Sequence, residues 1–390
     1  MQGQDQSTQF FDFDEAGRLK RVQDWRDDSG VSRCELRRYS YDEDSNRIRK
    51  RTNPESGTEC NDDTDGNVQL NTYDNADRMI NPGYAYDAFG RITTAPASDT
   101  GGAAVFNATY YANDLVRSIT QDGVTQTFDL DPMLRTEKKT KSGSSSSTET
   151  YAYADDSDSP AWTETSATTW TRTVDGVIGA EAVQTNAGVS LTIQNLRGDV
   201  VAQSSASGVL SNVSRVDEFG VPKGALPAGA KYAFHGSKQR EAVTPGGIVT
   251  MGVRLYQPQQ GRFLQVDPVL GGNESPYGYP VDPVNGMDLD GRIAYCSFRP
   301  SMPRVNHPSK GSKPVVWSST KIKCRGFASE AKVTLTITLQ FREHEGAAWK
   351  VMTVNVGVGR VKNGKFDMKL RVDAFCKQGY NDYFSTAMVA

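Results

Sequence analysis

Hydrophobic and polar residues alternate along much of the chain with a period of two, which is typical of half-buried β-strands. The alternation is clear at 33–41 and 125–128, and again near the C-terminus at 333–341, 352–356 and 366–372. Helical periodicity is nearly absent, and Pro and Gly recur too often for long helices. The sequence therefore predicts an all-β protein.

A short phrase recurs through the first 135 residues. It consists of an aromatic residue, Asp, two or three free residues, a turn-forming Gly, Asn or Asp, then Arg and an aliphatic residue. The copies are FDEAGRL at 13–19, YDEDSNRI at 41–48, YDNADRM at 73–79 and YDAFGRI at 86–92, with weaker ones at 111–117 and 128–135. Such self-similarity indicates a fold built from stacked units.

The residue types of the phrase predict a β-hairpin. The aromatic residue ends one strand, Asp turns the chain by binding nearby backbone amides, and Gly or Asn supplies positive φ before the return strand. A single hairpin buries too little apolar surface to be stable, so successive hairpins must stack. We expect one continuous antiparallel sheet, with each Asp at a turn and rings such as Tyr41, Tyr73 and Tyr86 packed inward.

The phrase resembles the YD repeat of the RHS (rearrangement hot spot) proteins, whose wider group includes the C component of insecticidal Tc toxins and the animal teneurins. NLRGDVV at 195–201 is similar to a segment of that family, and MGVRLYQPQQGRFLQVDPV at 251–269 is similar to its core signature. The signature continues through PYGY at 276–279 and DPVN at 282–285 to DLDG at 288–291. The residues that carry it are Tyr256, Gly261, Arg262, Phe263, Asp267, Pro268, Tyr277, Tyr279, Pro283 and Gly291.

The resemblance implies an order of domains. In that family the repeats form a β-sheet that spirals into a hollow shell, a core block ends the shell as a plug, and a variable domain, often a toxin, follows. We expect the repeat sheet over 1–240, the core plug over 241–292 and a separate domain over 293–390. The strand pattern of this last domain predicts a small β-sandwich or barrel, with a Pro-rich coil at 299–314 and a hairpin turn at 362–365.

The net charge of the chain changes sign at the same boundary, between residues 292 and 293. The net charge of the 390 residues is −3, but residues 293–390 hold 16 Lys and Arg against 6 Asp and Glu, a net charge of +10. Residues 1–292 therefore carry −13. Such asymmetry informs about partners rather than fold. We expect the C-terminal domain to bind a polyanion, either nucleic acid or an anionic surface polymer, and attraction to the acidic repeats is the alternative.

Composition narrows the class of protein further. Hydrophobic residues make up 37% of the chain, and the aromatic residues suffice for a core, which excludes wholesale disorder. No apolar stretch approaches the ~18 residues of a membrane-spanning helix. The first 25 residues are polar and do not resemble a signal peptide. We expect the sequence to be secreted or displayed at the cell surface as part of a larger exported chain.

The cysteines predict one disulfide and no metal site. Cys34 and Cys60 flank a polar stretch and could close a 26-residue loop in an oxidising compartment. Cys296, Cys324 and Cys376 allow no definite pairing, and none of the five forms a CxxC motif, so we expect neither a metal nor another cofactor. The Asp-rich segment 155–160 is interpreted as a turn, and it lacks the spacing of a calcium loop.

The resemblance also implies self-cleavage, because related Tc toxin and RHS shells cut their own chain just after the core block with aspartates of that block. The matching residues are Asp282, Asp288 and Asp290, and the scissile bond would lie near Arg292-Ile293. The chemistry would be that of an aspartic protease, in which one carboxyl stays protonated while the other activates water. The alternative is that these aspartates cap turns.

The C-terminal domain has few residues suited to catalysis. Glu343, His344 and Glu345 follow a predicted strand, where catalytic groups often gather. A metal-free nuclease could use His344 as general base with either glutamate, and an exposed polar turn is the alternative.

Two functions compete. The first is the C-terminal part of an RHS effector, a non-catalytic β-shell that encloses or presents a toxin-like domain neutralised by an immunity protein. The second is a secreted or cell-surface interaction protein whose C-terminal β-sandwich is a non-catalytic binding module.

Overall fold

The computed structural model describes residues 6–28, 31–57, 59–63, 66–144, 146–175, 181–227, 230–242, 244–269, 273–292, 295–300, 303–306, 315–325, 332–342, 350–360, 365–375 and 382–389. These residues form β-strands and short 3-10 helices but no α-helix, which confirms the all-β prediction. None of the helices in these residues is long and apolar enough to cross a membrane. The chain divides into two compact units, Met1–Asp267 with Asn273–Arg292, and Pro268–Gly272 with Ile293–Ala390.

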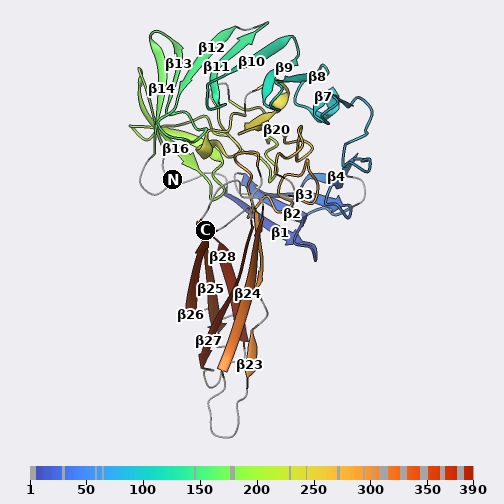
Figure 1. The fold of residues 1–390 in the computed structure, drawn as a ribbon, viewed down its shortest axis with the longest axis vertical. Helices are drawn as coiled ribbons and strands as arrows, with labels where there is room; N and C mark the ends of the chain where they lie inside the picture. The colour runs from blue at the N-terminus through green and yellow to red at the C-terminus, as the bar shows by residue number, and fades with distance from the viewer. Residues whose placement is uncertain are drawn as a thin grey trace. The chain divides into compact units, whose positions relative to one another are not determined.

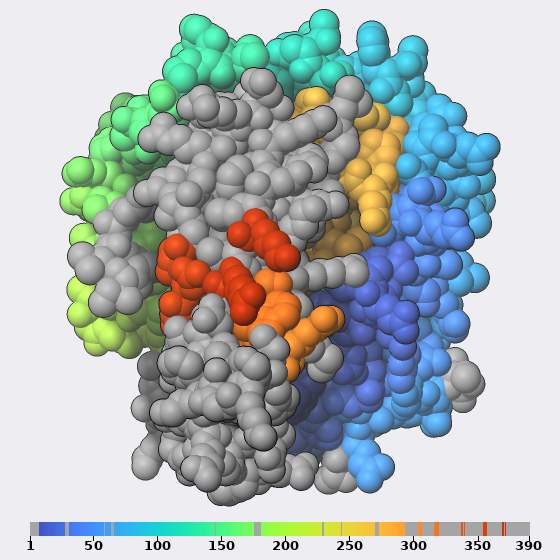
Figure 2. Space-filling view, turned by 60° about the horizontal axis from the view of Figure 1, so that its bottom comes forward, coloured from blue at the N-terminus to red at the C-terminus, as the bar shows by residue number. Residues whose placement is uncertain are grey.

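Two antiparallel sheets, each with its strands in chain order, make up most of the first unit (Figure 1). The first sheet contains β1 (Gln6–Phe13), β2 (Leu19–Asp28), β3 (Val31–Tyr41), β4 (Arg47–Ser56) and β5 (Asn67–Leu70). The second contains β6 (Ala85–Tyr86), β7 (Ile92–Ala95), β8 (Phe106–Tyr110), β9 (Val116–Gln121), β10 (Val124–Leu130), β11 (Thr136–Ser142), β12 (Ser147–Ala152), β13 (Trp162–Ser166), β14 (Thr169–Asp175), β15 (Glu181–Thr185), β16 (Gly188–Gln194), β17 (Val200–Ser205) and β18 (Leu210–Ser211). The surface of this unit accordingly changes in chain order from blue through cyan to green (Figure 2).

The Asp of the phrase turns the chain as predicted. The Asp87 carboxylate accepts hydrogen bonds from the backbone N–H groups of Phe89 at 2.9 Å and Arg91 at 3.1 Å, and its second oxygen lies 2.6 Å from Arg91 Nε. Gly90 has a φ of +78°, which favours glycine. The same pairing of Asp with the Arg four residues later occurs at Asp14, Asp74 and Asp131.

The Arg of the phrase also connects its hairpin to the next repeat. Arg91 Nη1 donates to the carbonyl oxygen of Tyr111 at 2.9 Å, and Arg135 Nη1 donates to that of Asp155 at 2.7 Å. The Arg135 guanidinium also stacks 4.0 Å from the centroid of the Tyr153 ring. Arg91 and Arg135 therefore fix both the turn on which they lie and the spacing to the next repeat.

The repeats do not form one continuous sheet, contrary to the prediction. The first sheet ends at β5 and the second begins at β6, and only an isolated bridge between Tyr73 and Met79 lies between them. The two phrases at this point, 73–79 and 86–92, are separated by residues 80–85. Pro82 stands in the short stretch that separates them and has no backbone N–H to donate to a ladder.

The core block packs against both sheets. Its strands β19 (Val249–Met251), β20 (Arg254–Gln257) and β21 (Arg262–Phe263) form a small antiparallel sheet, preceded by the 3-10 helices η3 (Gly236–Lys238) and η4 (Pro245–Gly247). Tyr256 belongs to the apolar cluster of the first sheet, whereas Leu255 packs with Phe106 and Phe128 of the second. Because successive strand residues point to opposite faces, β20 contributes to both cores at once.

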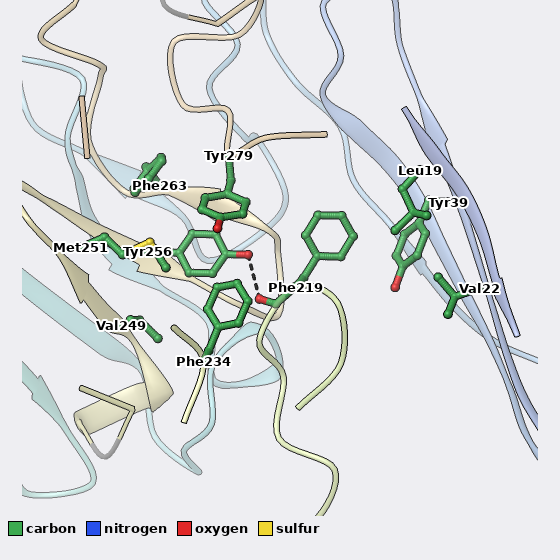
Figure 3. Close-up of a cluster of buried hydrophobic side chains, with 10 residues drawn as sticks. All are labelled: Leu19, Val22, Tyr39, Phe219, Phe234, Val249, Met251, Tyr256, Phe263 and Tyr279. Carbon is green, nitrogen blue, oxygen red and sulfur yellow. Dashed lines mark hydrogen bonds between the residues drawn. The ribbon is translucent and has the colours of Figure 1, made fainter. Parts of the chain in front are cut away.

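Phe219 connects the core block to the first sheet. Figure 3 shows its ring between the Tyr256 and Tyr279 rings on one side and Tyr39 on the other, and its carbonyl oxygen accepts the Tyr256 hydroxyl at 2.8 Å. The Phe219 and Tyr39 rings meet edge to face, with their centroids 5.1 Å apart.

A buried ionic network lies beside this cluster. Arg37 of β3 is fully buried, and its Nη2 lies 2.8 Å from the Glu218 carboxylate and 3.1 Å from that of Asp24. The Tyr39 hydroxyl also donates to Glu218. Burial lowers the pKa of Arg37, but the Glu218 carboxylate outweighs it and holds that pKa above the usual value.

The second unit contains two antiparallel sheets that pack against each other. One contains β22 (Tyr295–Pro300), β23 (Arg304–Asn306), β24 (Val315–Arg325) and β27 (Lys365–Phe375), and the other contains β25 (Lys332–Arg342), β26 (Lys350–Arg360) and β28 (Asp382–Val389). Val316 and Ser318 of β24 are buried, as are Ile337 and Leu339 of β25. The predicted strands at 333–341, 352–356 and 366–372 are thus found as β25, β26 and β27.

One local prediction for this unit is wrong. The expected coil at 299–314 is interrupted by strand residues, since β22 extends to Pro300 and β23 pairs with β24. The short-range pattern does not reveal which strand a segment will pair with. Of the hairpin turn predicted at 362–365, only Lys365 lies within the described residues, and β26 and β27, the strands before and after it, belong to different sheets.

The ionic network predicts unequal costs for two acidic residues that each bind arginine. Glu218→Ala should lower the free energy of unfolding by about 3–5 kcal/mol, because it leaves Arg37 buried without its main partner. Asp62→Ala should cost no more than about 1 kcal/mol, since Asp62 is 42% exposed where it pairs with Arg38 and Arg51. Urea unfolding of both variants tests this, and equal costs would contradict it.

Candidate functional site at the end of the core block

The last residues of the core block lie directly against the turn between β19 and β20. The N–H of Val253 donates to the carbonyl oxygen of Asp290 at 3.0 Å. Gly252 has a φ of +57°, and a Cβ there would lie 2.2 Å from the same oxygen. Gly291 has a φ of +66°, and a Cβ there would lie 2.5 Å from the Met251 carbonyl oxygen. Two glycines therefore allow the approach that fixes Asp288–Arg292 in place.

The carboxylates of Asp288 and Asp290 converge on one backbone amide. The N–H of Arg292 donates to Asp288 Oδ1 at 3.0 Å and to Asp290 Oδ1 at 3.1 Å. Asp288 is only 2% exposed, whereas Asp290 is exposed. The pair thus combines a buried and an accessible carboxyl next to the point where the first unit ends.

Arg254 holds the buried member of the pair. Its Nη2 lies 2.7 Å from Asp288 Oδ2 and 3.0 Å from Asp267 Oδ2, and its guanidinium covers the Phe263 ring at 3.7 Å. Burial raises the pKa of Asp288 to about 7, and the carboxyls of Asp290 and Asp267 act in the same direction, although Arg254 opposes them. One guanidinium does not neutralise three neighbouring carboxyls. Asp288 is therefore partly protonated near neutral pH.

Asp282 lies in a separate turn. Its carboxylate accepts the backbone N–H groups of Val284 at 3.2 Å and Asn285 at 3.1 Å, and the Asn285 side-chain amide at 2.9 Å. Among the described residues, no hydrogen bond joins Asp282 to Asp288 or Asp290. The structure thus brings together two of the three aspartates singled out in the sequence and places the third in a cap of its own turn.

A cavity of about 500 Å³ lies beside the pair within the first unit. Asp290 and Arg292 form part of its wall, and residues from β9 to β12 and the turns between them form much of the rest. The wall is mixed in character and includes Leu115, Phe128, Leu130, Met133, Lys139 and Tyr151. Because Asp290 borders this space, water can reach its carboxylate.

The other core-signature residues form the interior around this site. Tyr256, Phe263, Tyr277, Tyr279 and Pro283 are buried, and Pro268 is exposed. The Tyr279 hydroxyl lies 2.7 Å from Nε2 of His235, a residue that the sequence analysis did not single out. Burial lowers the pKa of His235 to about 4, so its imidazole is neutral at neutral pH.

The remaining predicted residues are elsewhere. Cys34 and Cys60 form a disulfide, with Cα atoms 4.9 Å apart. Glu343, His344 and Glu345 lie outside the described residues. A further turn, not predicted from the sequence, is formed by VDEFGVP at 216–222, where the Asp217 carboxylate accepts the N–H groups of Phe219 and Val221 at 2.9 Å each. Its Asp-x-x-Gly spacing was a visible signal, but the phrase lacks both the aromatic residue and the Arg.

Comparison with known proteins gives structural matches alone. No protein-family model matches the sequence. No curated protein sequence matches it either. Crystal structures of TcdB2-TccC3-Cdc42 and of TcdB2-TccC3 without its hypervariable C-terminal region match 73% of the chain, with TM-scores of 0.53 and 0.50 and identities of 16% and 15%. A Tc holotoxin pore from Photorhabdus luminescens with a TccC3 mutation also matches 73%, with a TM-score of 0.53 and 16% identity.

The chain shares the fold of these Tc toxin components. It spans 15–17% of their length, so the likeness concerns one portion of much longer proteins. The all-β class expected from the sequence is therefore found in this chain, and what the chain does is a separate question.

The raised pKa of Asp288 predicts how stability depends on pH. Because the folded-state pKa of about 7 lies above the value of about 3.9 for an unfolded Asp, the native state binds the proton more tightly. Asp288 thus contributes stability below pH ~4 that is lost as the pH rises through ~7. Asp288→Asn should flatten this part of the profile of unfolding free energy against pH. An unchanged slope between pH 4 and 7 would contradict the assignment.

Proposed function

We propose that this chain is the C-terminal part of a protein built like the RHS and Tc toxin components. In this proposal the two sheets and the core block are a scaffold that presents the basic second unit and releases it by cutting the chain at Arg292-Ile293. The observation that carries the proposal is the placement of two carboxyls, one buried and one exposed, on the Arg292 amide. The shared fold supports it.

The proposed cut is a hydrolysis by the two aspartates of this pair. The Asp290 carboxylate, which borders the cavity, takes a proton from water, and the water oxygen attacks the Arg292 carbonyl carbon. The bond from that carbon to the nitrogen of Ile293 then breaks, and Asp288 donates its proton to the leaving amine. Arg254 and the Arg292 N–H orient the carboxyls. The products are a carboxyl group on Arg292 and a free amine on Ile293.

Export as part of a larger chain belongs to the same proposal. The Cys34–Cys60 disulfide supports it, because disulfides persist in oxidising compartments and are rare in the cytosol.

A denaturing gel tests the cut. The purified wild-type chain should run as two fragments, and mass spectrometry should place the new ends at Arg292 and Ile293. Asp288→Asn and Asp290→Asn should each run as one full-length band, because each removes one of the two proton-transfer groups.

Asp282→Asn is the matched control, since its carboxylate caps a turn of the same block. It should yield both fragments as the wild type does. A full-length wild-type band that persists after folding would refute the cut, and loss of cleavage in all three variants would indicate a general effect on the block.

We further propose that the second unit binds a polyanion through one face of its four-stranded sheet. The register places Arg299, Lys321 and Lys369 in one row across β22, β24 and β27. Odd-numbered residues of β24 share this face, opposite the buried Val316 and Ser318. The charged residues of this face whose side chains the structure describes are Arg304, Lys369 and Arg371, and all three are exposed.

This arrangement of cations favours a role in binding an anionic partner, rather than a contribution to solubility alone. Cations opposite one another across strands repel, and such rows are unfavourable without an anionic partner. Lys369 and Arg304 are exposed and therefore available to phosphates or other anions. The same face serves either of the two functions considered for the unit, a toxin-like domain or a binding module.

Salt dependence tests this face. The wild-type chain should bind a fluorescent single-stranded RNA, with log affinity falling linearly against log salt. The double variant Arg304→Glu, Lys369→Glu should bind more weakly and lose about 2 from the slope, one for each phosphate contact removed. Lys138→Glu, which changes an exposed cation of the first unit, should leave both unchanged. Absence of RNA binding by the wild type at low salt would rule out this form of the proposal.

A further inference from the structure

Two arginines are buried in the first unit without a carboxylate partner. Arg47 and Arg262 are 5% and 4% exposed, and no ion pair involves either of them within the described residues. Arg47 Nη2 donates to the Gln259 carbonyl oxygen, and Arg262 Nη2 donates to that of Asp77 at 2.7 Å. The Arg47 Nε and Nη1 atoms and the Arg262 Nε atom have no hydrogen-bond partner.

Arg47 reaches this position because its repeat departs from the others by one residue. In the second phrase Asn46, and not an Arg, stands four residues after the turn aspartate, and its backbone and side-chain nitrogens bind the Asp42 carboxylate at 2.8 and 3.1 Å. Arg47 is thereby released from the turn and enters the core block. Its Nη1 lies 2.9 Å from where a Cβ of Gly261 would be, so the glycine of the core signature makes room for it.

The two arginines line a shared cavity. It has a volume of about 20 Å³, and its wall includes Arg47, Arg262, Gln260 and Tyr41. Gln260 Nε2 and the Tyr41 hydroxyl also lack partners. Every unpartnered atom of these four residues can donate a hydrogen bond, and only the hydroxyl can also accept one.

We propose that this cavity binds a monoatomic anion, with chloride as the ligand. A buried charge is costly unless it is paired, and an anion here would compensate the two guanidinium groups and accept hydrogen bonds from the free donors. The volume holds little more than one water-sized particle, which excludes phosphate and sulfate. A water molecule fits the space, but it brings two hydrogens of its own to a wall whose free groups are donors.

The site would join the repeats to the core block, since Arg47 and Tyr41 come from the second repeat and Gln260 and Arg262 from the core signature. This role is independent of any cut after Arg292, because none of the four residues contacts Asp288 or Asp290 in the described hydrogen bonds and ion pairs. A bound anion should therefore stabilise the first unit whether or not the chain cleaves itself.

Bromide in place of chloride tests the site directly. Crystals of the full chain grown or soaked in sodium bromide should show an anomalous peak within hydrogen-bond distance of Arg47 Nη1 and Gln260 Nε2. A water peak without anomalous signal at that position, or empty density, would overturn the proposal.

Thermal unfolding provides a test in solution. At constant ionic strength, replacing gluconate by chloride should raise the midpoint by about 2–4 °C for each tenfold rise in chloride above the dissociation constant. Arg47→Met should abolish this dependence, whereas Arg135→Met, which alters an Arg paired with Asp131 in another repeat, should retain it.

Tyr41→Phe keeps the proposal testable if Arg47→Met does not fold. It removes one free donor without removing the ring, so a higher chloride concentration should be needed for the same rise in midpoint. A wild-type midpoint that does not respond to chloride, or one that responds equally in Arg47→Met, would refute the site.

Discussion

The Asp–Arg pair found at four of the repeat turns is the interaction on which the first unit depends. As an isolated surface ion pair it would be worth little. Here it positions a guanidinium whose remaining donors bind the carbonyl oxygen of the next repeat and whose plane stacks on an aromatic ring. Arg135 serves the turn at Asp131 and the neighbouring repeat at the same time. The chain can therefore stack many short strands with a hydrophobic content of only 37%, because arginine and tyrosine supply part of the packing that aliphatic residues give elsewhere.

Buried arginines also organise the packing of the core block, but the number of carboxyl groups around each arginine differs. Arg254 faces an excess of carboxyls, and the result is a raised pKa for Asp288 beside the end of the unit. Arg47 and Arg262 form no ion pair among the described residues, and they line a small cavity with unpartnered donors. Both arrangements leave a local charge imbalance in a buried place, where the low dielectric makes it costly. Sites of this kind are where function is expected, since a core built for stability alone would have balanced them.

Much of the fold could be predicted because the residues of the phrase make the hydrogen bonds that stabilise its turn. Asp87 and Gly90 hold their conformation through contacts within five residues, so sequence spacing suffices to identify them. The break between β5 and β6 was not predicted, since the phrases specify each turn and not the pairing between neighbouring strands. The pairing of β26 with β25 and of β27 with β24 is likewise decided by long-range packing. At the candidate site, residue types indicated aspartates, but only the fold separates Asp282, in its own turn, from the pair on the Arg292 amide.

The opposite charges of the two regions would give the proposed cleavage after Arg292 a further physical meaning. A stretch with −13 and a tail with +10 attract each other, and in one chain the tether keeps their effective concentration high. A cut does not change that attraction, but it makes the association bimolecular, so that dilution and salt can separate the fragments. A polyanion would then compete with the acidic repeats for the face of β22, β24 and β27. If the acidic repeats bind the basic unit in this way, a competing partner must carry a higher density of negative charge than the repeats do.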